Sequence, residues 1–168
     1  MSTIPLPFAA DVYPLPPFTL RTLPPSEAEP IGARLTTMDP WKRLGYSAMA
    51  LGRSLANPDP ALNRFAVHDA NETIGIVCIR FPWLRGPYLE LLAIFPEAQG
   101  RGTGQAILTW LEEQVRLGSS NIWALTSEFN LRARAFYQTA GFVEIASLPG
   151  LVASGTSEIL LRKTLVIG

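Results

Sequence analysis

The sequence is poor in the residues that build cross-links and metal centres. Of its 168 residues one is a cysteine, Cys78, and one is a histidine, His68. A single cysteine excludes a disulfide within the chain and a metal site made of several cysteines. Cys78 lies in an apolar segment, so we expect an inert core thiol, and we expect His68 at the surface near a turn. The sequence therefore predicts neither a metal site nor a covalent cysteine mechanism.

Net charge and long apolar runs are also lacking. Fourteen Lys and Arg residues balance fourteen Asp and Glu residues, so the formal net charge is zero. This balance argues against a nucleic-acid partner, which would favour a basic surface. No apolar run is long enough to cross a bilayer, and the first apolar residues lack the basic flank of a signal peptide. We therefore expect a cytoplasmic protein without a nucleic-acid or membrane partner.

What the sequence has is a hydrophobic fraction of 48% over a length that suits one domain. Prolines cluster in the first 25 residues, which disfavours helices and interior strands there. We interpret residues 1–17 as a proline-rich extended arm that either packs on its own chain or crosses to a second subunit. Residues 18–168 are then a single domain. The arm, together with edge strands near the C-terminus, is compatible with a homodimer.

Alternation and helical spacing predict an α+β fold. Ser26 and Glu29 resemble a capping box at the start of one helix, and Asp39 with Pro40 resembles the start of a second. Strands are expected at residues 18–23, 65–68, 73–81, 88–95, 121–126, 142–146 and 158–165, and helices at 26–35, 40–55, 105–117 and 130–140. This order predicts a mixed, largely antiparallel sheet of about seven strands flanked by about four helices, with a central parallel crossover.

Residues 99–104 read Gln-Gly-Arg-Gly-Thr-Gly, directly after an apolar strand and directly before an amphipathic helix. Glycines let the backbone turn tightly, and the start of a helix leaves N–H groups unpaired with a partial positive charge. Together these features predict a site for a phosphate or pyrophosphate. A Walker A loop would need a lysine after the last glycine, and a Rossmann turn would need a different glycine spacing.

The turn Gln99-x-x-Gly102-x-Gly104 resembles the acetyl-coenzyme A motif of the GNAT superfamily of N-acetyltransferases. A second segment is similar to that family's later signature, and its matching residues are Asn130, Ala133, Phe136, Tyr137, Gly141 and Phe142. The resemblance implies a GNAT-like fold and an acetyl-CoA-dependent N-acetyltransferase. Such an enzyme moves an acetyl group to a primary amine by direct attack in a ternary complex, with acetyl-CoA as co-substrate and no metal.

The resemblance also implies which residues bind the coenzyme: Leu92, Ala93, Ile94, Gln99, Gly100, Arg101, Gly102, Thr103, Gly104, Gln105, Asn130 and Tyr137. Backbone groups of residues 92–94 would pair with the pantetheine arm, and those of residues 100–105 would hold the pyrophosphate. Arg101 would add charge to a phosphate or be a solvated loop cation. Asn130 would bind the arm, cap its helix or do both. Arg132 and Arg134 would reach the 3′-phosphate or be surface charges.

Two residues are candidates for acid–base chemistry. Tyr137 would be the general acid, because a phenol stays protonated at neutral pH and can donate to a departing thiolate. Its alternative is an ordinary buried aromatic residue. Glu90 would be the base, because a carboxylate between leucines in an apolar strand suits that role. Glu90 could instead bind the acceptor's ammonium group, with a water chain removing the proton, and by alternation it should share a face with Tyr88 and Leu92.

The acceptor is expected where the first two helices cover the sheet. That region offers Met38, Trp41, Tyr46 and Met49 and few acids. A polycationic acceptor would require more carboxylates, so we expect a small, weakly charged or partly apolar amine. A protein N-terminus or lysine stays open, as do a longer acyl group and an oxygen acceptor. The same glycine turn would also serve a non-catalytic acetyl-CoA-binding sensor that regulates a partner.

Overall fold

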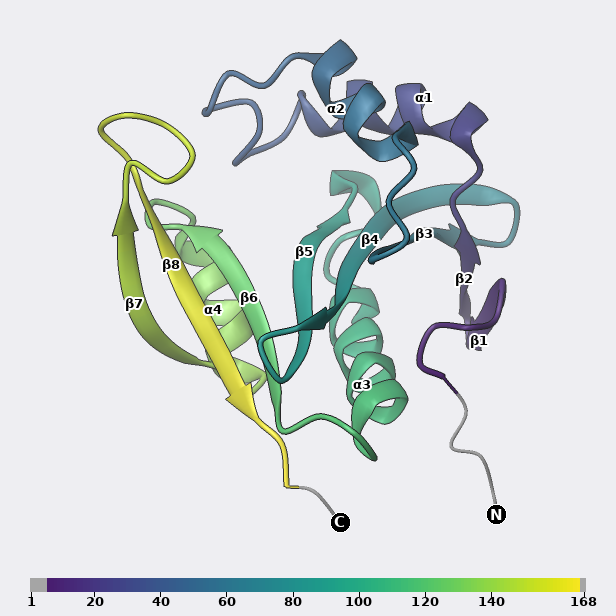
Figure 1. The fold of residues 1–168 in the computed structure, drawn as a ribbon. Coiled ribbons are helices and arrows are strands. Elements are labelled where there is room, and N and C mark those ends of the chain that lie inside the picture. The colour runs from purple at the N-terminus through teal and green to yellow at the C-terminus, as the bar shows by residue number, and fades with distance from the viewer. Residues whose placement is uncertain (1–5, 167–168) are drawn as a thin grey trace.

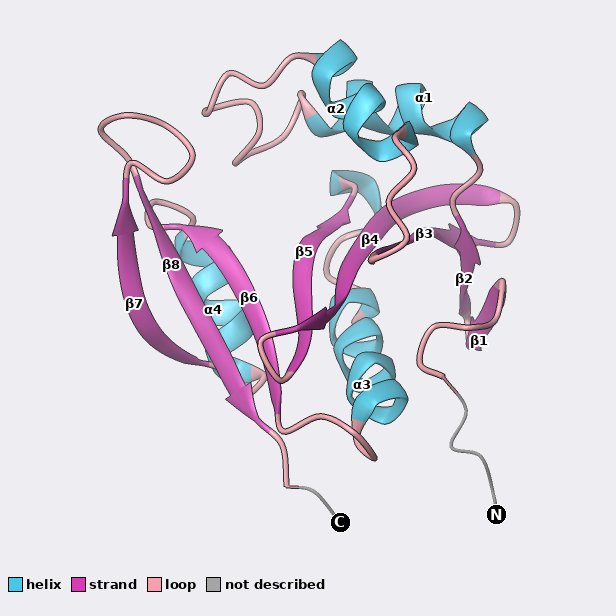
Figure 2. Cartoon of the chain, viewed as in Figure 1, coloured by secondary structure: helices cyan, strands magenta, loops and turns pink. Residues whose placement is uncertain are grey.

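The computed structural model describes residues 6–166 and contains eight strands and four helices within that range (Figures 1 and 2). The strands are β1 (Val12–Leu15), β2 (Phe18–Thr22), β3 (Leu62–Asp69), β4 (Glu72–Trp83), β5 (Gly86–Ile94), β6 (Asn121–Ser127), β7 (Val143–Pro149) and β8 (Ser157–Thr164). The helices are α1 (Pro25–Leu35), α2 (Ala48–Ala56), α3 (Thr103–Val115) and α4 (Leu131–Thr139), with a short 3₁₀ turn over Pro96–Ala98.

All eight strands join one sheet in the order β1-β2-β3-β4-β5-β6-β8-β7. Neighbouring strands are antiparallel except β5 and β6, which are parallel because helix α3 carries the chain back across the sheet between them. The predicted α+β fold is confirmed, with one strand more than the sequence indicated. That extra strand, β1, pairs with β2 from Val12–Arg21 to Leu15–Phe18.

The proline-rich segment packs on its own chain over the residues that the structure describes. Phe8 is 6% exposed, and its ring lies 5.7 Å from the rings of both Phe81 and Trp110. Pro14 is tolerated within β1 because this strand is at the edge of the sheet. Residues 1–5 of the expected arm lie outside the described residues, and the boundary of the domain at residue 18 stays a prediction.

The predicted starts of the first two helices are wrong. Helix α1 begins at Pro25, and Ser26 lies inside it, so no capping box forms. The second helix does not begin at Pro40. Residues 36–45 form successive turns, Gly45 has φ of +74°, and α2 begins at Ala48 with the Ser47 hydroxyl accepting a hydrogen bond from the Ala50 N–H. A residue with positive φ cannot continue a right-handed helix. Residues 36–47, here called the turn segment, therefore remain irregular.

Two apolar clusters hold the helices on opposite faces of the sheet. Val77 and Ile79 of β4 pack on the side of α3 and α4, whereas Ile76 and Cys78 pack on the side of α1 and α2. Cys78 is buried as expected, and burial raises its pKa to about 12, so the thiol is inert. The surface position expected for His68 is wrong, because its side chain is only 9% exposed on β3.

A β-bulge at Glu90 changes the middle of the sheet. Cys78 of β4 pairs with Leu91 but the next residue, Ile79, pairs with Leu89, which leaves Glu90 as an extra residue in β5. Leu92 consequently packs on the α3 side, whereas Leu91 packs on the α1 side. The expectation that Glu90 shares a face with Leu92 is therefore wrong, since the bulge reverses the alternation between them.

Strands β5 and β6 stay together for only two residue pairs, Tyr88–Trp123 and Leu89–Ala124. Beyond Leu89 the two strands diverge, as Figure 1 shows in the centre of the molecule. The backbone of β5 from Leu91 to Ile94 thus pairs with β4 on one side and has no strand on the other. This opening in the sheet positions the candidate site.

Candidate active site

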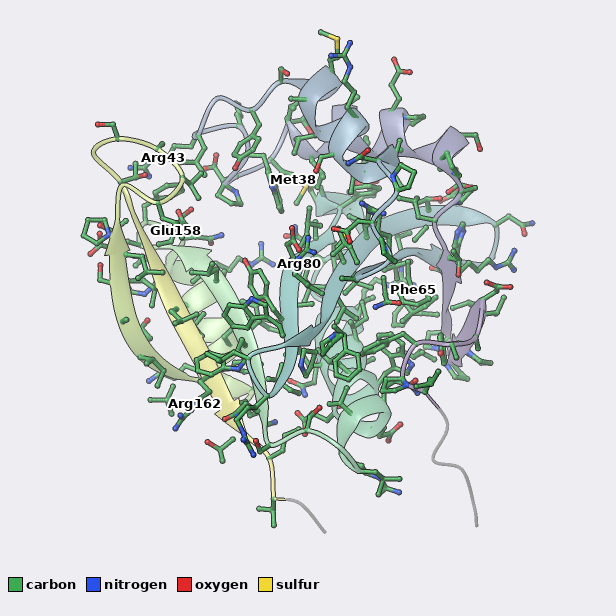
Figure 3. The ribbon with its side chains drawn as sticks, viewed as in Figure 1. Met38, Arg43, Phe65, Arg80, Glu158 and Arg162 are labelled. Atoms are coloured by element: carbon green, nitrogen blue, oxygen red, sulfur yellow. The ribbon has the colours of Figure 1, made fainter. Side chains whose placement is uncertain are left out.

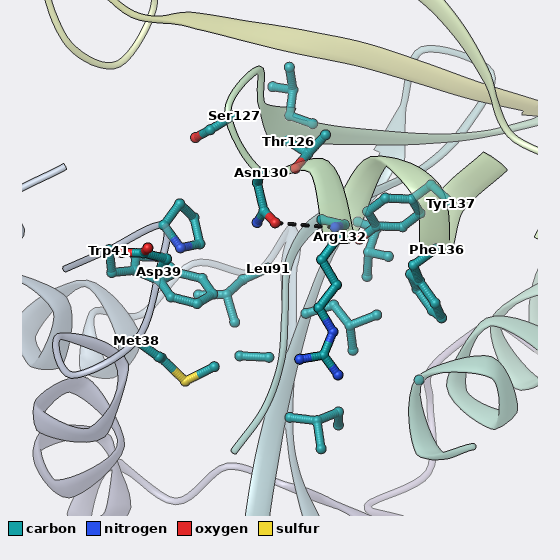
Figure 4. Close-up of a pocket in the computed structure, with 18 of the residues that line it drawn as sticks. Met38, Asp39, Trp41, Leu91, Thr126, Ser127, Asn130, Arg132, Phe136 and Tyr137 are labelled. Atoms are coloured by element: carbon teal, nitrogen blue, oxygen red, sulfur yellow. Dashed lines mark hydrogen bonds between the residues drawn. The ribbon is translucent and has the colours of Figure 1, made fainter. Parts of the chain in front are cut away.

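A cavity of about 1180 Å³ occupies the opening between β5 and β6. The turn segment and β5 line one side of it, and the start of α3, the end of β6 and α4 line the other (Figure 4). Of the catalytic and coenzyme-binding residues predicted from the sequence, all except the candidate arginines Arg101 and Arg134 line this cavity: Glu90, Leu92, Ala93, Ile94, Gln99, Gly100, Gly102, Thr103, Gly104, Gln105, Asn130, Arg132 and Tyr137.

The three glycines of the turn serve two different purposes. Gly100 and Gly102 have φ of +76° and +78°, a conformation that favours glycine and turns the chain from β5 into α3. Gly104 has no such φ. A Cβ atom there would lie 3.0 Å from the ring of Phe136, so this glycine lets α3 approach α4. Two glycines therefore shape the backbone, and the third allows the helices to pack.

The start of α3 has the properties of an anion site. Gly102 is the N-cap residue and offers no side chain, so the first N–H groups of the helix have no side-chain partner. The Thr103 hydroxyl is buried and has no hydrogen-bond partner within the described residues. An unpaired buried hydroxyl costs about 1–3 kcal/mol. A phosphate oxygen at the helix start would supply the missing partner, so these residues fit the pyrophosphate of a coenzyme.

Gln99 and Arg132 connect the two sides of the cavity. The Gln99 side-chain amide donates to the Ile94 carbonyl at 2.8 Å, and its carbonyl accepts from Arg132 Nη1 at 2.5 Å. Figure 4 shows the Arg132 side chain extending from α4 into the cavity. Arg132 therefore places a positive charge inside the cavity.

The two other candidate arginines are held elsewhere. Arg101 donates to Asp69 at 2.6 Å, stacks over the ring of Phe18 and does not line the cavity. Arg134 makes a bidentate ion pair with Glu144, in which Nε and Nη2 donate to the two carboxylate oxygens at 2.7 and 3.0 Å. The interpretation of both residues as ordinary surface cations is favoured by these contacts.

Asn130 caps α4 as the sequence predicts. Its side-chain carbonyl accepts a hydrogen bond from the Ala133 N–H at 3.1 Å, drawn as the dashed line in Figure 4. Asn130 also lines the cavity. The cap uses the oxygen, which leaves the amide N–H groups to donate to a ligand.

Tyr137 lies on α4 with its ring packed against Phe136 and Phe142, each at 5.2 Å between ring centroids. Its side chain is 6% exposed, and burial raises its pKa, with a smaller contribution from nearby Tyr88. The hydroxyl has no hydrogen-bond partner within residues 6–166, yet it is not sealed from the cavity. Tyr137 is thus a protonated phenol with an unused donor at the cavity wall.

The sequence suggested apolar surroundings for Glu90, but the structure pairs its side chain with a cation. Its carboxylate accepts from Arg80 at 2.9 and 3.4 Å, and Arg80 also binds Asp59 at 2.9 Å. The bulge explains this outcome, because it presents Glu90 on the face where Arg80 of the neighbouring strand lies. A paired and partly exposed carboxylate is less available as a base.

Sequence reasoning missed Glu158, a second glutamate in the cavity. It lies at the start of β8, opposite Ser127 of β6, and is 6% exposed. The Ser127 hydroxyl donates to Glu158 Oε1 at 2.9 Å, and burial raises the pKa of Glu158. Alternation with Ile159 could have shown which face it occupies. Nothing in the sequence could have shown that β8 lies next to β6.

The turn segment closes the other end of the cavity. Met38, Trp41 and Tyr46 line it as expected, whereas Met49 is 62% exposed and does not. The Arg43 guanidinium lies 4.1 Å from the centre of the Phe129 ring, so the turn segment contacts the loop between β6 and α4. The acceptor end is therefore aromatic and partly enclosed.

Neither a metal cluster nor a membrane-spanning helix occurs within residues 6–166. In that part of the chain, no group of three or more His, Cys, Asp and Glu side chains is arranged to hold a metal ion. No helix there has both the length and the apolar character needed to cross a membrane.

Comparison with known proteins points to one family. A family model described as the acetyltransferase (GNAT) family matches residues 29–142, which include the glycine turn and α4. No curated protein matches the chain in sequence.

Solved structures share the fold at low sequence identity. An acetyltransferase from Thermus thermophilus has a TM-score of 0.71 at 24% identity, covering 88% of this chain and 97% of its own. A ribosomal-protein alanine N-acetyltransferase from Escherichia coli has 0.70 at 18%, covering 90% and 96%. A spermidine N-acetyltransferase from Vibrio cholerae, in complex with CoA and spermine, has 0.70 at 22%, covering 89% and 96%.

Proposed function

Because the chain belongs to the GNAT family of acetyltransferases, we propose that it transfers the acetyl group of acetyl-CoA to the nitrogen of a primary amine. Transfer takes place by direct attack in a ternary complex. One observation carries the proposal: the glycine turn, the unpaired edge of β5 and the Tyr137 hydroxyl all face the same cavity. A phosphate site, a site for an extended amide chain and a proton donor are what such a transfer requires.

The coenzyme's pyrophosphate would be held by the N–H groups of residues 100–105, by the Thr103 hydroxyl and by Arg132. The pantetheine arm would lie along the edge of β5 where β6 has diverged. Backbone groups of Leu92, Ala93 and Ile94 would pair with its amides, and the Asn130 amide would donate to it from the other side.

The chain would act on the reaction at two points. A backbone N–H of residues 92–94 would donate to the thioester oxygen and stabilise the negative charge that develops there. Tyr137 would then donate its proton to the sulfur as the carbon–sulfur bond breaks. The sequence predicts Glu90 as the base, but its carboxylate is paired with Arg80, so the group that takes the proton of the amine is left open at this point.

The acceptor would enter between the turn segment and the end of β6. Trp41, Tyr46 and Tyr88 offer aromatic surface there, and Arg43 adds a positive charge. These features support a small, weakly charged amine more than a polycation.

Two measurements test the function. Calorimetry with acetyl-CoA is expected to show binding to the pure protein, and a free-thiol assay is expected to show coenzyme A release with at least one amine of a panel of monoamines, amino acids and peptides. Binding without release across the panel would favour a coenzyme sensor. Absence of binding at millimolar acetyl-CoA would reject both functions.

A further inference from the structure

The cavity contains one buried carboxylate that no cation neutralises. Its acidic lining residues are Asp39, Glu90 and Glu158. Glu90 is paired with Arg80, whereas Asp39 is exposed to solvent and accepts a hydrogen bond from the backbone N–H of Arg43. Glu158 receives only the neutral Ser127 hydroxyl, and no ion pair within residues 6–166 includes it. A ligand with a positive charge would find its counter-charge here.

The burial of Glu158 makes this lack of a partner costly. Its side chain is nine-tenths buried, and a buried carboxylate without a cation is unfavourable because it has lost most of its hydration. The hydrogen bond from Ser127 occupies Oε1. The second oxygen, Oε2, has no partner in the described chain but is not closed off from the cavity. That oxygen is therefore available to a molecule in the cavity.

The position of Glu158 relates it to both tyrosines of the site. Ile159 and Leu161 pack on the side of α3 and α4, so Glu158 lies on the opposite face of β8, toward the acceptor end. Tyr88 and both glutamates line the same cavity; burial raises the pKa of Tyr88, and the nearby charges of Glu90 and Glu158 raise it further. Tyr88 in turn makes a small contribution to the raised pKa of Tyr137. Figure 3 labels Glu158 near the start of β8, across from Met38 and Arg80.

We propose that Glu158 binds the ammonium group of the acceptor and takes the proton that the amine must lose before it attacks. The proposal rests on the acetyl-transfer function given above. It replaces Glu90 in the role of base and gives Glu90 the role of holding Arg80 within the network of β4 and β5.

The protons of the reaction then balance. The ammonium group gives one proton to Glu158, and the neutral amine forms the new carbon–nitrogen bond. Tyr137 gives its proton to the sulfur as the carbon–sulfur bond breaks. The second proton of the nitrogen restores the Tyr137 phenol, and Glu158 releases its proton to solvent. The products are the amide, the free thiol of coenzyme A and one proton.

The electrostatics of the cavity suit this role. Burial raises the pKa of Glu158, which brings the basicity of its carboxylate closer to neutral pH. The charged and titratable groups that share the cavity with it are Cys78 of β4, Tyr88 and Glu90 of β5, Tyr137 and Arg132 of α4, and Asp39, Arg43 and Tyr46 of the turn segment. The two arginines line the cavity outside any contact with Glu158, so its charge is left for the acceptor.

The same arrangement defines the class of acceptor. One free carboxylate between aromatic side chains matches an amine with a single positive charge and an apolar body. A second ammonium group would meet Arg43, the already paired Glu90 or the solvated carboxylate of Asp39, none of which offers a buried, unpaired counter-charge. The chain should therefore acetylate monoamines in preference to spermidine-like polyamines of similar length.

The test compares two variants with the same chemical change, Glu158→Gln and Glu90→Gln. Rates of thiol release with acetyl-CoA and a monoamine are measured from pH 5 to pH 10, and acetyl-CoA binding is measured by calorimetry. Glu158→Gln is expected to lower kcat/KM for the amine by about 100-fold, to lose the rise in rate with pH that depends on Glu158, and to keep acetyl-CoA affinity. Glu90→Gln is expected to keep that rise in rate and to lose less than about fivefold.

Equal pH profiles for wild type and Glu158→Gln, with rates within about threefold, would overturn the proposal. If the rate stopped rising with pH in Glu90→Gln but still rose in Glu158→Gln, Glu90 would be the base. A third variant, Ser127→Ala, removes the hydroxyl that positions Glu158 and is expected to shift the profile without abolishing it. An unchanged Ser127→Ala profile would also count against Glu158.

A measurement without turnover separates this proposal from the function it rests on. The Glu158 carboxyl signal, identified by its loss in Glu158→Gln, is followed by carbon-13 NMR as the pH and then the amine concentration are raised. It is expected to titrate above the ordinary range of glutamate and to shift when a monoamine binds. A normal titration without a response to amine would reject Glu158 even if acetyl transfer were established. Failure of the function would instead appear as no acetyl-CoA binding by wild type.

Discussion

The two ends of the cavity are built in different ways. At the coenzyme end, residues 99–105 and 130–137 come from two continuous segments and act largely through backbone N–H groups and helix starts. At the acceptor end, the turn segment, Glu90 and Glu158 come from three distant parts of the chain and act through side chains. The first kind of site leaves a motif in the sequence, and the second does not.

This difference has a physical basis. A backbone site depends on φ angles and on the absence of side chains, and glycine at fixed spacing records both. A side-chain site depends on which strands become neighbours and on where a bulge reverses the alternation. Glu158 illustrates this, because its importance comes from the pairing of β8 with β6 and from the Ser127 hydroxyl. The following variants test each end separately.

Besides the loss expected for Glu158→Gln, the largest effect is expected at Tyr137, where both ends of the cavity meet. Tyr137→Phe removes the phenol hydroxyl and keeps the ring packed against Phe136 and Phe142. Without a proton donor for the sulfur, turnover should fall at least about tenfold, while acetyl-CoA affinity should change little. Thiol release and calorimetry measure the two quantities. Unchanged turnover would make Tyr137 an ordinary core aromatic.

The next effect isolates the coenzyme end. Thr103→Val keeps the shape of the side chain but removes the buried hydroxyl that has no partner in the described chain. The free protein should become more stable, while acetyl-CoA affinity should fall about fivefold, because one hydrogen bond to a phosphate is lost. Melting temperature and calorimetry measure the opposite changes. Thr109→Val, on the exposed side of α3, is the control and should alter neither.

A smaller effect separates the two glutamates by stability. A carboxyl group with a raised pKa in the fold binds its proton more tightly there, so its ionisation costs stability once the pH rises above about 4.3. Glu158→Gln should therefore melt higher than wild type at pH 8, and the difference should vanish near pH 4. Glu90→Gln should melt at a lower temperature than wild type at pH 8, because Arg80 loses a partner. The expected loss in the free energy of unfolding is up to about 1 kcal/mol. Changes of the same sign would contradict the comparison.

The smallest effect concerns Arg101. Asp69 and the ring of Phe18 hold it outside the cavity. Arg101→Gln should therefore leave the acetyl-CoA dissociation constant within about twofold. Arg132→Gln, which alters a cation inside the cavity, should weaken binding more. A larger loss in Arg101→Gln than in Arg132→Gln would show that the turn rearranges around the coenzyme.

Most of the fold could be predicted from the sequence, because local patterns determine it. Alternation identified seven of the eight strands, and Asn130 identified the start of α4. Strand β1 was missed because its prolines disfavour strands, whereas an edge position tolerates them. The start of α2 was misplaced because Pro40 resembles a first helical residue, and the positive φ of Gly45 could not be foreseen.

The candidate site was predictable to a lesser degree. The glycine turn, Asn130 and Tyr137, which the sequence singled out, line one cavity in the structure. Gly104, which the resemblance assigns to the coenzyme, lines the cavity and also lets Phe136 of α4 approach α3, a packing role that the sequence did not show. The sequence placed Glu90 among leucines, whereas the bulge directs it to Arg80. Such errors arise wherever an outcome depends on a neighbouring strand.

The divergence of β5 from β6 has a consequence for the solubility of the folded chain. An unpaired strand edge ordinarily invites pairing with other molecules and so promotes aggregation. Here the N–H and C=O groups of β5 that pair with no strand line the cavity inside the molecule, with β6 and α4 on its other side. A slender extended molecule can enter and complete the sheet, whereas the strand of another folded protein meets β6 first. The fold thus offers hydrogen bonds to a small ligand without offering them to its own copies.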